Sequence, residues 1–253
     1  MRAMLAHDIN RGPALRRKLK DPDWCAERKF DGVRTLVHID RGTVSWRNRS
    51  DEELTKPVPE ELTEALRLPG HVVIDGELVG ETLFAFDLPV LGKSIITSPF
   101  HERRKALEGV AKIVDHPSLK ITSPDQDKSG ILREAMDRNW EGIILRDIRS
   151  QYVPGVRSNL MLKLKLTKDI DCVITDVGVD GKESANLALW DHNASDWTPI
   201  GRCSTFGKEN VGVGDVVQVR YLHVSENGRI VQPRMLRKRT DKDPQACDIH
   251  QIR

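Results

Sequence analysis

A change of pattern near residues 166–168 limits the folds open to this chain of 253 residues. Before it, β-type runs at 34–39, 72–78 and 142–145 alternate with helical patterns at 59–67, 99–114 and 128–138. After it, short β-type runs at 171–179, 185–191, 200–206 and 215–224 are separated by Gly or Asn turns. We therefore predict an α+β domain over residues 1–166 and an all-β domain, a small barrel, over residues 167–253.

Composition narrows the class of protein. A hydrophobic content of 38% is enough for a substantial core. No apolar run approaches the ~20 residues of a membrane helix, and charges interrupt the first twenty residues where a secretory segment would lie. Without such a segment we expect a cytoplasmic protein. The cysteines are too scattered for a metal motif, and we expect free thiols at Cys25, Cys172, Cys203 and Cys247.

Charge is unevenly distributed along the chain. Residues 1–50 carry 12 basic against 6 acidic side chains and residues 201–253 carry 10 against 6, whereas residues 51–100 carry 3 against 10. Basic ends suit a duplex phosphate backbone. A net charge of +2 is no nucleic-acid signature, however, so chance clustering on a solvated surface stays open on this ground alone.

The segment from Glu27 to Arg34 contains a candidate nucleophile. Lys29 stands two positions before an Asp-Gly pair and five before Arg34. A lysine amine can attack the α-phosphate of a nucleotide, expel pyrophosphate and hold the nucleotide as a phosphoramidate. Free lysine titrates near ~10.4, so such a nucleophile needs neighbouring cations, metal or burial to lower its pKa. Asp-Gly is also a common turn, which leaves the segment ambiguous by itself.

Six further segments follow in one order, and each has an ordinary structural interpretation as a hairpin end, core strand, solvated strand face or basic surface patch. Each also supplies a residue type that nucleotide chemistry needs, such as a carboxylate for Mg²⁺ or ribose, an aromatic face for a base, or paired cations for phosphate. They are Trp46–Arg49, Val72–Val79 with Glu77, Thr82–Leu88 with Phe86, Trp140–Arg146 with Glu141, Met161–Leu166 with Lys163 and Lys165 on one strand face, and Arg237–Lys242.

In this order the segments resemble the motifs of the covalent nucleotidyltransferase superfamily, specifically ATP-dependent DNA ligases of the small two-domain kind. The resemblance covers nearly the whole chain, including residues 4–6, 91–94, 102–107, 152–165 and 219–228. It implies a nucleotidyltransferase (adenylylation) domain followed by an OB-fold domain. It also implies a monomeric enzyme that seals 5′-phosphate/3′-hydroxyl nicks in duplex DNA through a lysyl-AMP and a DNA-adenylate.

The resemblance implies a role for each candidate site residue. Lys29 would accept AMP, with Glu27 and the backbone at Arg28 reading adenine. Phe86 would stack on adenine and Glu77 would hold the ribose. The remaining contacts to ribose, phosphate or the nick's 5′-phosphate would come from Arg34 and Arg47.

The other implied roles concern metal and phosphates. Glu141 would organise Mg²⁺, with Mn²⁺ able to replace it, and Glu77 could contribute through water. Lys163 and Lys165 would hold the α-phosphate and lower the pKa of the nucleophile by like-charge proximity. The leaving pyrophosphate would be oriented by Arg239, Asp241 and Lys242.

The chain differs from the motifs of these ligases at two positions, and several alternative functions stay open. Arg49 stands where these ligases often have glycine, which leaves the local turn open, and Arg146 stands where they often have lysine. Only 28 residues precede Lys29, and the longest break between C-terminal strands is expected near 191–199, so we expect the two domains' own surfaces to hold the duplex. The alternatives are an RNA ligase, an mRNA-capping guanylyltransferase, or a non-catalytic OB-fold nucleic-acid-binding protein.

Overall fold

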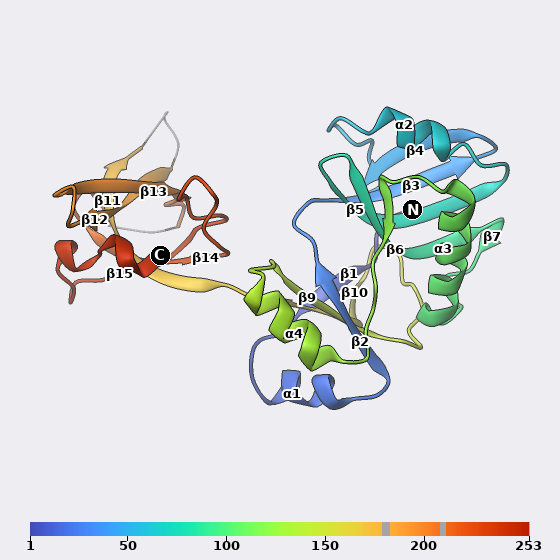
Figure 1. The fold of residues 1–253 in the computed structure, drawn as a ribbon, viewed down its shortest axis with the longest axis horizontal. Coiled ribbons are helices and arrows are strands. Elements are labelled where there is room, and N and C mark those ends of the chain that lie inside the picture. The colour runs from blue at the N-terminus through green and yellow to red at the C-terminus, as the bar shows by residue number, and fades with distance from the viewer. Residues whose placement is uncertain (179–182, 208–210, 253) are drawn as a thin grey trace. The chain divides into compact units, whose positions relative to one another are not determined.

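The computed structural model describes residues 1–178, 183–207 and 211–252, and the chain divides into two compact units, Met1–Lys165 and Leu166–Arg253 (Figure 1). In the described ranges, no helix is long and apolar enough to cross a membrane. The N-terminal unit contains two mixed sheets and four helices, and the described residues of the C-terminal unit form one antiparallel sheet.

The smaller sheet of the N-terminal unit carries the lysines. Its strand order is β1 (Leu5–Asp8), β10 (Arg157–Lys165), β9 (Gly142–Asp147) and β2 (Trp24–Lys29), with β1 parallel to β10 and the other pairs antiparallel. Helix α4 (Lys128–Asp137) packs on β2 and β9, and α1 (Pro13–Lys20) lies against α4. Along β10, Leu162 and Leu164 are buried while Lys163 and Lys165 are more exposed, as the alternation predicts.

The larger sheet of the N-terminal unit follows the order β4 (Thr43–Asn48), β3 (Val33–Asp40), β5 (His71–Val79), β6 (Thr82–Leu91) and β7 (Lys93–Ser94), with β8 (Leu119–Ile121) parallel to β6. Helix α3 (Phe100–Val114) packs on β6 (Figure 1). Leu62 of α2 (Glu60–Ala65) joins the same core.

Helix α3 forms because its buried positions recur every three to four residues. Phe100, Leu107 and Val110 give it an apolar face, and it ends at Asp115, whose φ of 41° is left-handed. Arg103 and Arg104 are buried on the same helix, which is exceptional for charged side chains. Their partners lie beside the candidate site.

The C-terminal unit contains β11 (Lys168–Val177), β12 (Ser184–Asp191), β13 (Asp196–Ser204), β14 (Val216–Tyr221) and β15 (Arg234–Lys238), in the order β13-β12-β11-β14-β15. Two short 3₁₀ helices, η2 (Pro244–Ala246) and η3 (Ile249–Ile252), follow. Position 179, the predicted end of the first of these strands, lies outside the described residues.

One loop prediction for this unit is wrong. We expected the longest break between strands near 191–199, but residues 192–195 alone join β12 to β13, because Trp190 pairs with Trp197 and the strands run to the turn. The interval 222–233 between β14 and β15 is longer, and it contains a bridge between Val224 and Ile230.

Candidate active site

A cavity in the N-terminal unit brings together most of the predicted nucleotide-binding residues. Strands of both sheets contribute to its wall. The lining residues are Leu5, Ala6, Glu27, Arg28, Lys29, Phe30, Arg34, Arg49, Glu77, Phe86, Ile144, Arg146, Arg157, Met161 and Lys163.

Lys29 and Lys165 share one buried carboxylate. In the smaller sheet, Gly142 of β9 pairs with Lys29 on one side and with Lys165 on the other. Glu141, the preceding residue, is 5% exposed; its Oε2 contacts Lys29 Nζ, and its Oε1 lies 3.3 Å from Lys165 Nζ. A buried carboxylate needs such compensation. The two lysines are therefore bridged by an anion rather than placed side by side.

Gly142 makes this arrangement possible. A Cβ at this position would lie 1.9 Å from the carbonyl oxygen of Leu164 on β10, closer than any side chain allows. Any other residue would push β9 away from β10 and separate Glu141 from Lys165. The glycine after Glu141 is thus required for backbone approach rather than for a turn.

Glu77 and Lys163 also face the cavity. Burial raises the pKa of Glu77; the charges of Arg34 and Lys29 oppose the rise, and that of Glu141 adds to it. Lys163 Nζ lies 3.5 Å from Asp8 Oδ1. Glu77 is therefore influenced by the charges of Arg34, Lys29 and Glu141, whereas the ion pair of Lys163 is with Asp8.

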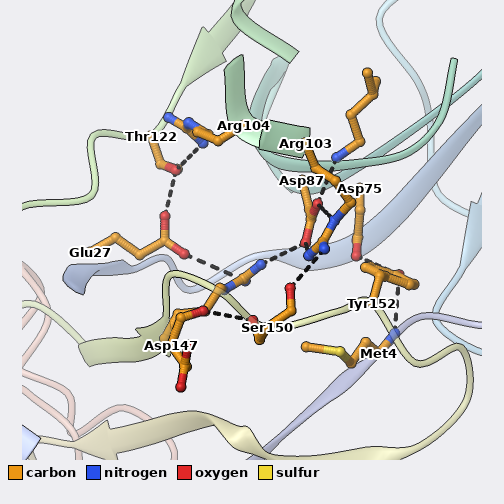
Figure 2. Close-up of polar contacts among 12 residues, drawn as sticks. Met4, Glu27, Asp75, Asp87, Arg103, Arg104, Thr122, Asp147, Ser150 and Tyr152 are labelled. Atoms are coloured by element: carbon orange, nitrogen blue, oxygen red, sulfur yellow. Dashed lines mark hydrogen bonds and ion pairs between the residues drawn. The ribbon is translucent and has the colours of Figure 1, made fainter. Parts of the chain in front are cut away.

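Arg34 is firmly held. Its Nε and Nη2 donate to the two oxygens of Asp75 at 2.6 and 2.7 Å, and Nη2 also lies 3.2 Å from the Met4 carbonyl oxygen. Tyr152 donates to Asp75 at 2.7 Å and accepts from the Met4 N–H at 3.1 Å (Figure 2). The sequence argument missed Asp75 and Tyr152. Its role for Arg34 as a ribose or phosphate ligand stays a prediction.

Aromatic rings and guanidinium groups lie together in the wall of the cavity. Phe86 is 8% exposed, with Arg34 Cζ 4.3 Å and Arg146 Cζ 5.7 Å from its ring centroid. Arg28 Cζ lies 4.7 Å from the Phe30 ring, which stacks on Phe84 at 3.9 Å. A flat, electron-rich ring in a cavity can stack on a base.

A buried ion network lies directly behind Phe86. Asp87 accepts from Arg103 Nε and Nη2 at 2.8 and 2.9 Å and from Arg146 Nη1 at 2.7 Å. Arg103 Nη1 also donates to the Ser150 carbonyl oxygen at 2.9 Å (Figure 2). Burial would raise the pKa of Asp87, but the hydrogen bonds and charges of the arginines prevail and lower it.

The sequence analysis did not predict this network, although it carried two signals. Asp87 follows Phe86 directly in a strongly apolar run, where a charged residue needs a buried partner. Arg103 lies at helical spacing from Phe100 and Leu107, on the face that the helix buries.

Arg47 and Arg49 differ in position. Arg47 Nη1 donates to the Asp51 carbonyl oxygen at 3.0 Å, and Arg47 is not among the residues that line the cavity, whereas Arg49 is. The left-handed residue of this turn is Asp51, with φ 71°, rather than Arg49. The turn therefore accepts an arginine at position 49, which resolves the question raised by the missing glycine.

The basic cluster near the C-terminus lies in the other unit. Arg239 donates to Asp241 at 2.7 Å and to Asp171 at 3.0 Å, and Lys242 Nζ lies 3.1 Å from Asp171. Asp171 belongs to β11, so the segment is tied to its own sheet by a carboxylate. It is not a loose basic tail.

Comparison with known proteins identifies the family. A family model described as "ATP dependent DNA ligase domain" matches residues 3–82 and 80–165. The chain belongs to this family, as the motif order indicated. DNA ligase 1 of Korarchaeum cryptofilum is 31% identical over 212 residues, covering 69% of this chain and 38% of the relative. A DNA ligase of Methanothrix thermoacetophila is 29% identical, covering 87% and 48%. The chain spans less than half the length of these relatives.

Solved structures share the fold. A mycobacterial DNA ligase D complexed with ATP and MES is 24% identical, with a TM-score of 0.57 over 98% of this chain and 97% of that chain. A Lig E DNA ligase is 18% identical, with a TM-score of 0.64 over 94% and 99%. The α+β prediction for the N-terminal unit is confirmed by its mixed sheets and few helices.

Proposed function

We propose that this chain is an ATP-dependent DNA ligase that seals nicks in duplex DNA. Lys29 Nζ would attack the α-phosphorus of ATP and expel pyrophosphate. The AMP would pass to the nick's 5′-phosphate, and the 3′-hydroxyl would then displace it to form the phosphodiester. The observation that carries the proposal is the shared contact of Lys29 and Lys165 with Glu141 beside a cavity with an aromatic wall.

The cavity suggests how the nucleotide is oriented. Phe86 would stack on adenine, Glu27 would face its polar edge, and Glu77 would bind the ribose. The α-phosphate would meet Lys163 and Lys165, which can stabilise the charge that develops during transfer. Of these residues, Phe86, Glu27, Glu77 and Lys163 line the cavity, and Lys165 contacts Glu141, the partner of Lys29.

Mg²⁺ fits the donors available. This ion is commonly held by one or two carboxylates together with substrate phosphates and water. Glu141 and Glu77 are carboxylates whose charges interact. Glu141 would hold the ion, Glu77 could contribute through water, and Mn²⁺ would bind the same donors. The ion would neutralise phosphate charge.

We also propose that the C-terminal unit is an OB fold, which would orient pyrophosphate through Arg239, Asp241 and Lys242. In support, β13 lies against β15 as well as β12, so the ends of its five-stranded sheet approach each other as in a barrel. Its core is continuous across the strands and includes Ile174, Leu187 and Val217.

The test is covalent labelling. The protein is incubated with α-labelled ATP, GTP or NAD and Mg²⁺, then separated by denaturing electrophoresis. We expect label from ATP alone, lost in Lys29→Ala and kept in Lys105→Ala, which changes an exposed lysine on α3. Label from GTP alone would indicate a capping guanylyltransferase. Label on another lysine would refute the assignment of Lys29.

A further inference from the structure

A buried chain of hydrogen bonds joins Arg104 and Thr122 to Glu27, a residue of the cavity wall. Thr122 Oγ1 donates to Glu27 Oε2 at 2.6 Å and accepts from Arg104 Nη1 at 3.0 Å. Figure 2 shows Thr122 between the other two side chains. All three are buried, and among them Glu27 lines the cavity. The Thr122 backbone N–H donates to the carbonyl oxygen of Ala85, the residue before Phe86.

The direction of these hydrogen bonds is fixed by chemistry. A guanidinium group only donates, an ionised carboxylate only accepts, and a hydroxyl has one proton. The hydroxyl of Thr122 must therefore accept from Arg104 and give its proton to Glu27. Thr122 is an oriented donor that cannot turn away while Arg104 is in place.

Arg146 holds the other oxygen of the same carboxylate. Its Nη2 lies 3.6 Å from Glu27 Oε1, while its Nη1 donates to Asp87 at 2.7 Å. A lysine at this position has a single ammonium group and could not keep the forked geometry toward both carboxylates. Each oxygen of Glu27 therefore faces a cationic or hydroxyl donor of the protein, which restricts rotation of the carboxylate.

We infer that Thr122 and Arg146 are positioning residues for base selectivity, because they hold Glu27 as a fixed acceptor for a 6-amino purine. The inference rests on the proposed function, in which Glu27 faces the base. A 6-amino group can donate to the carboxylate, whereas a 6-oxo group would place two acceptors together and leave both unpaired. A carboxylate that could rotate would reject the 6-oxo purine less strongly.

The experiment uses Thr122→Val, which removes the hydroxyl and keeps the shape. Covalent transfer of the nucleotide to Lys29 is measured with ATP, GTP and a purine ribonucleoside triphosphate that lacks the 6-amino group. We expect kcat/KM for ATP to fall about tenfold, mainly through KM, as for one hydrogen bond to a charged group. The 6-deamino analogue should lose little, and the preference for ATP over GTP should narrow about tenfold.

Two further variants sharpen the test. Thr122→Ser keeps the hydroxyl and should restore the preference, and Arg146→Lys should narrow it. Thr63→Val is the matched control, because the Thr63 hydroxyl also donates, to Pro59 O at 2.8 Å, and accepts, from Trp46 Nε1 at 3.0 Å, on α2. It should leave the preference unchanged. Equal losses for all three nucleotides in Thr122→Val would make Thr122 merely structural and overturn the inference.

Equilibrium binding separates this inference from the proposed function. The dissociation constants of ATP and GTP are measured for wild type and Thr122→Val without a chemical step. If none of the nucleotides labels the wild-type protein, the proposed ligase chemistry is refuted. An ATP-to-GTP binding ratio that Thr122→Val leaves unchanged would refute the positioning role.

Discussion

Replacing Asp87 with Asn should destabilise the N-terminal unit strongly while leaving it folded. Asp87 is fully buried and is the shared anion of Arg103 and Arg146, which are themselves buried. Asn keeps the size but removes the charge and turns a donor toward arginine donors. Removing one partner of a buried ion pair costs about 3–5 kcal/mol, against a total stability of about 5–15 kcal/mol for a domain.

The assay is denaturant unfolding at neutral pH, followed by tryptophan fluorescence, with the change read from the midpoint at constant slope. Trp24 and Trp46 are buried in this unit and should report its transition. Glu64→Gln is the control, because Glu64 pairs with Arg67 on the surface, where the side chains are 63% and 58% exposed. It should cost less than about 0.5 kcal/mol. A loss below about 1 kcal/mol for Asp87→Asn would refute the reasoning.

The pH dependence gives an independent check. The arginines lower the pKa of Asp87 in the folded state, so the unfolded chain binds this proton more readily. The stabilisation is therefore present above the unfolded pKa, near ~3.9, and is lost as pH falls through the lower folded value. Wild type and Asp87→Asn should differ most at neutral pH and converge in acid. A constant difference down to the acid transition would contradict the assignment.

Three other outcomes follow from the site and the charge distribution. Lys242→Ala should nearly eliminate Lys29 adenylylation yet spare sealing of a nick that already carries 5′-adenylate, whereas Glu141→Ala should impair both; equal loss on both substrates for Lys242→Ala would mean a structural or DNA-binding role. Sealing should require a 5′-phosphate and fall steeply between ~50 and ~300 mM salt, because binding depends on phosphate contacts, and equal rates would oppose this. Burial raises the pKa of Cys25 to about 12 and of Cys203 and Cys247 to about 11, so native thiols should resist alkylation at pH 8 and react after denaturation; rapid labelling of the native protein would be inconsistent with the buried positions.

Patterns of local sequence were sufficient for the elements that hold the site. The alternation in Met161–Leu166 correctly placed Lys163 and Lys165 on the face of β10 opposite the buried Leu162 and Leu164, because strand side chains alternate between faces. The pattern at 99–114 predicted α3 almost to its ends. These features depend on neighbours in the chain, which a single sequence displays.

Contacts between residues that lie far apart in the sequence could not be predicted from local patterns. Asp75 meets Tyr152 and Arg34, and Glu27 meets Thr122, across sequence separations of 77, 41 and 95 residues. Nothing in the local pattern near 122 distinguishes a threonine that holds a carboxylate from one that faces solvent. The position of Arg47 outside the cavity wall likewise depends on the turn at Asp51, whose φ of 71° no motif displays.

The contact between Glu141 and the lysines changes the interpretation of Lys29 as the proposed nucleophile. From the motifs, Lys163 and Lys165 were expected to lower the pKa of Lys29 by like-charge proximity, but a buried carboxylate contacts both Lys29 and Lys165. Glu141 is stable in a buried position because these lysines compensate it, and they approach each other because it screens them. A nucleotide α-phosphate with Mg²⁺ would bring both kinds of charge to the same place, with phosphate oxygens available to the lysines and the cation available to Glu141. In the proposed function, a metal–nucleotide complex would thus redistribute the charges that stabilise the site, and this would free the Lys29 amine from its contact with Glu141.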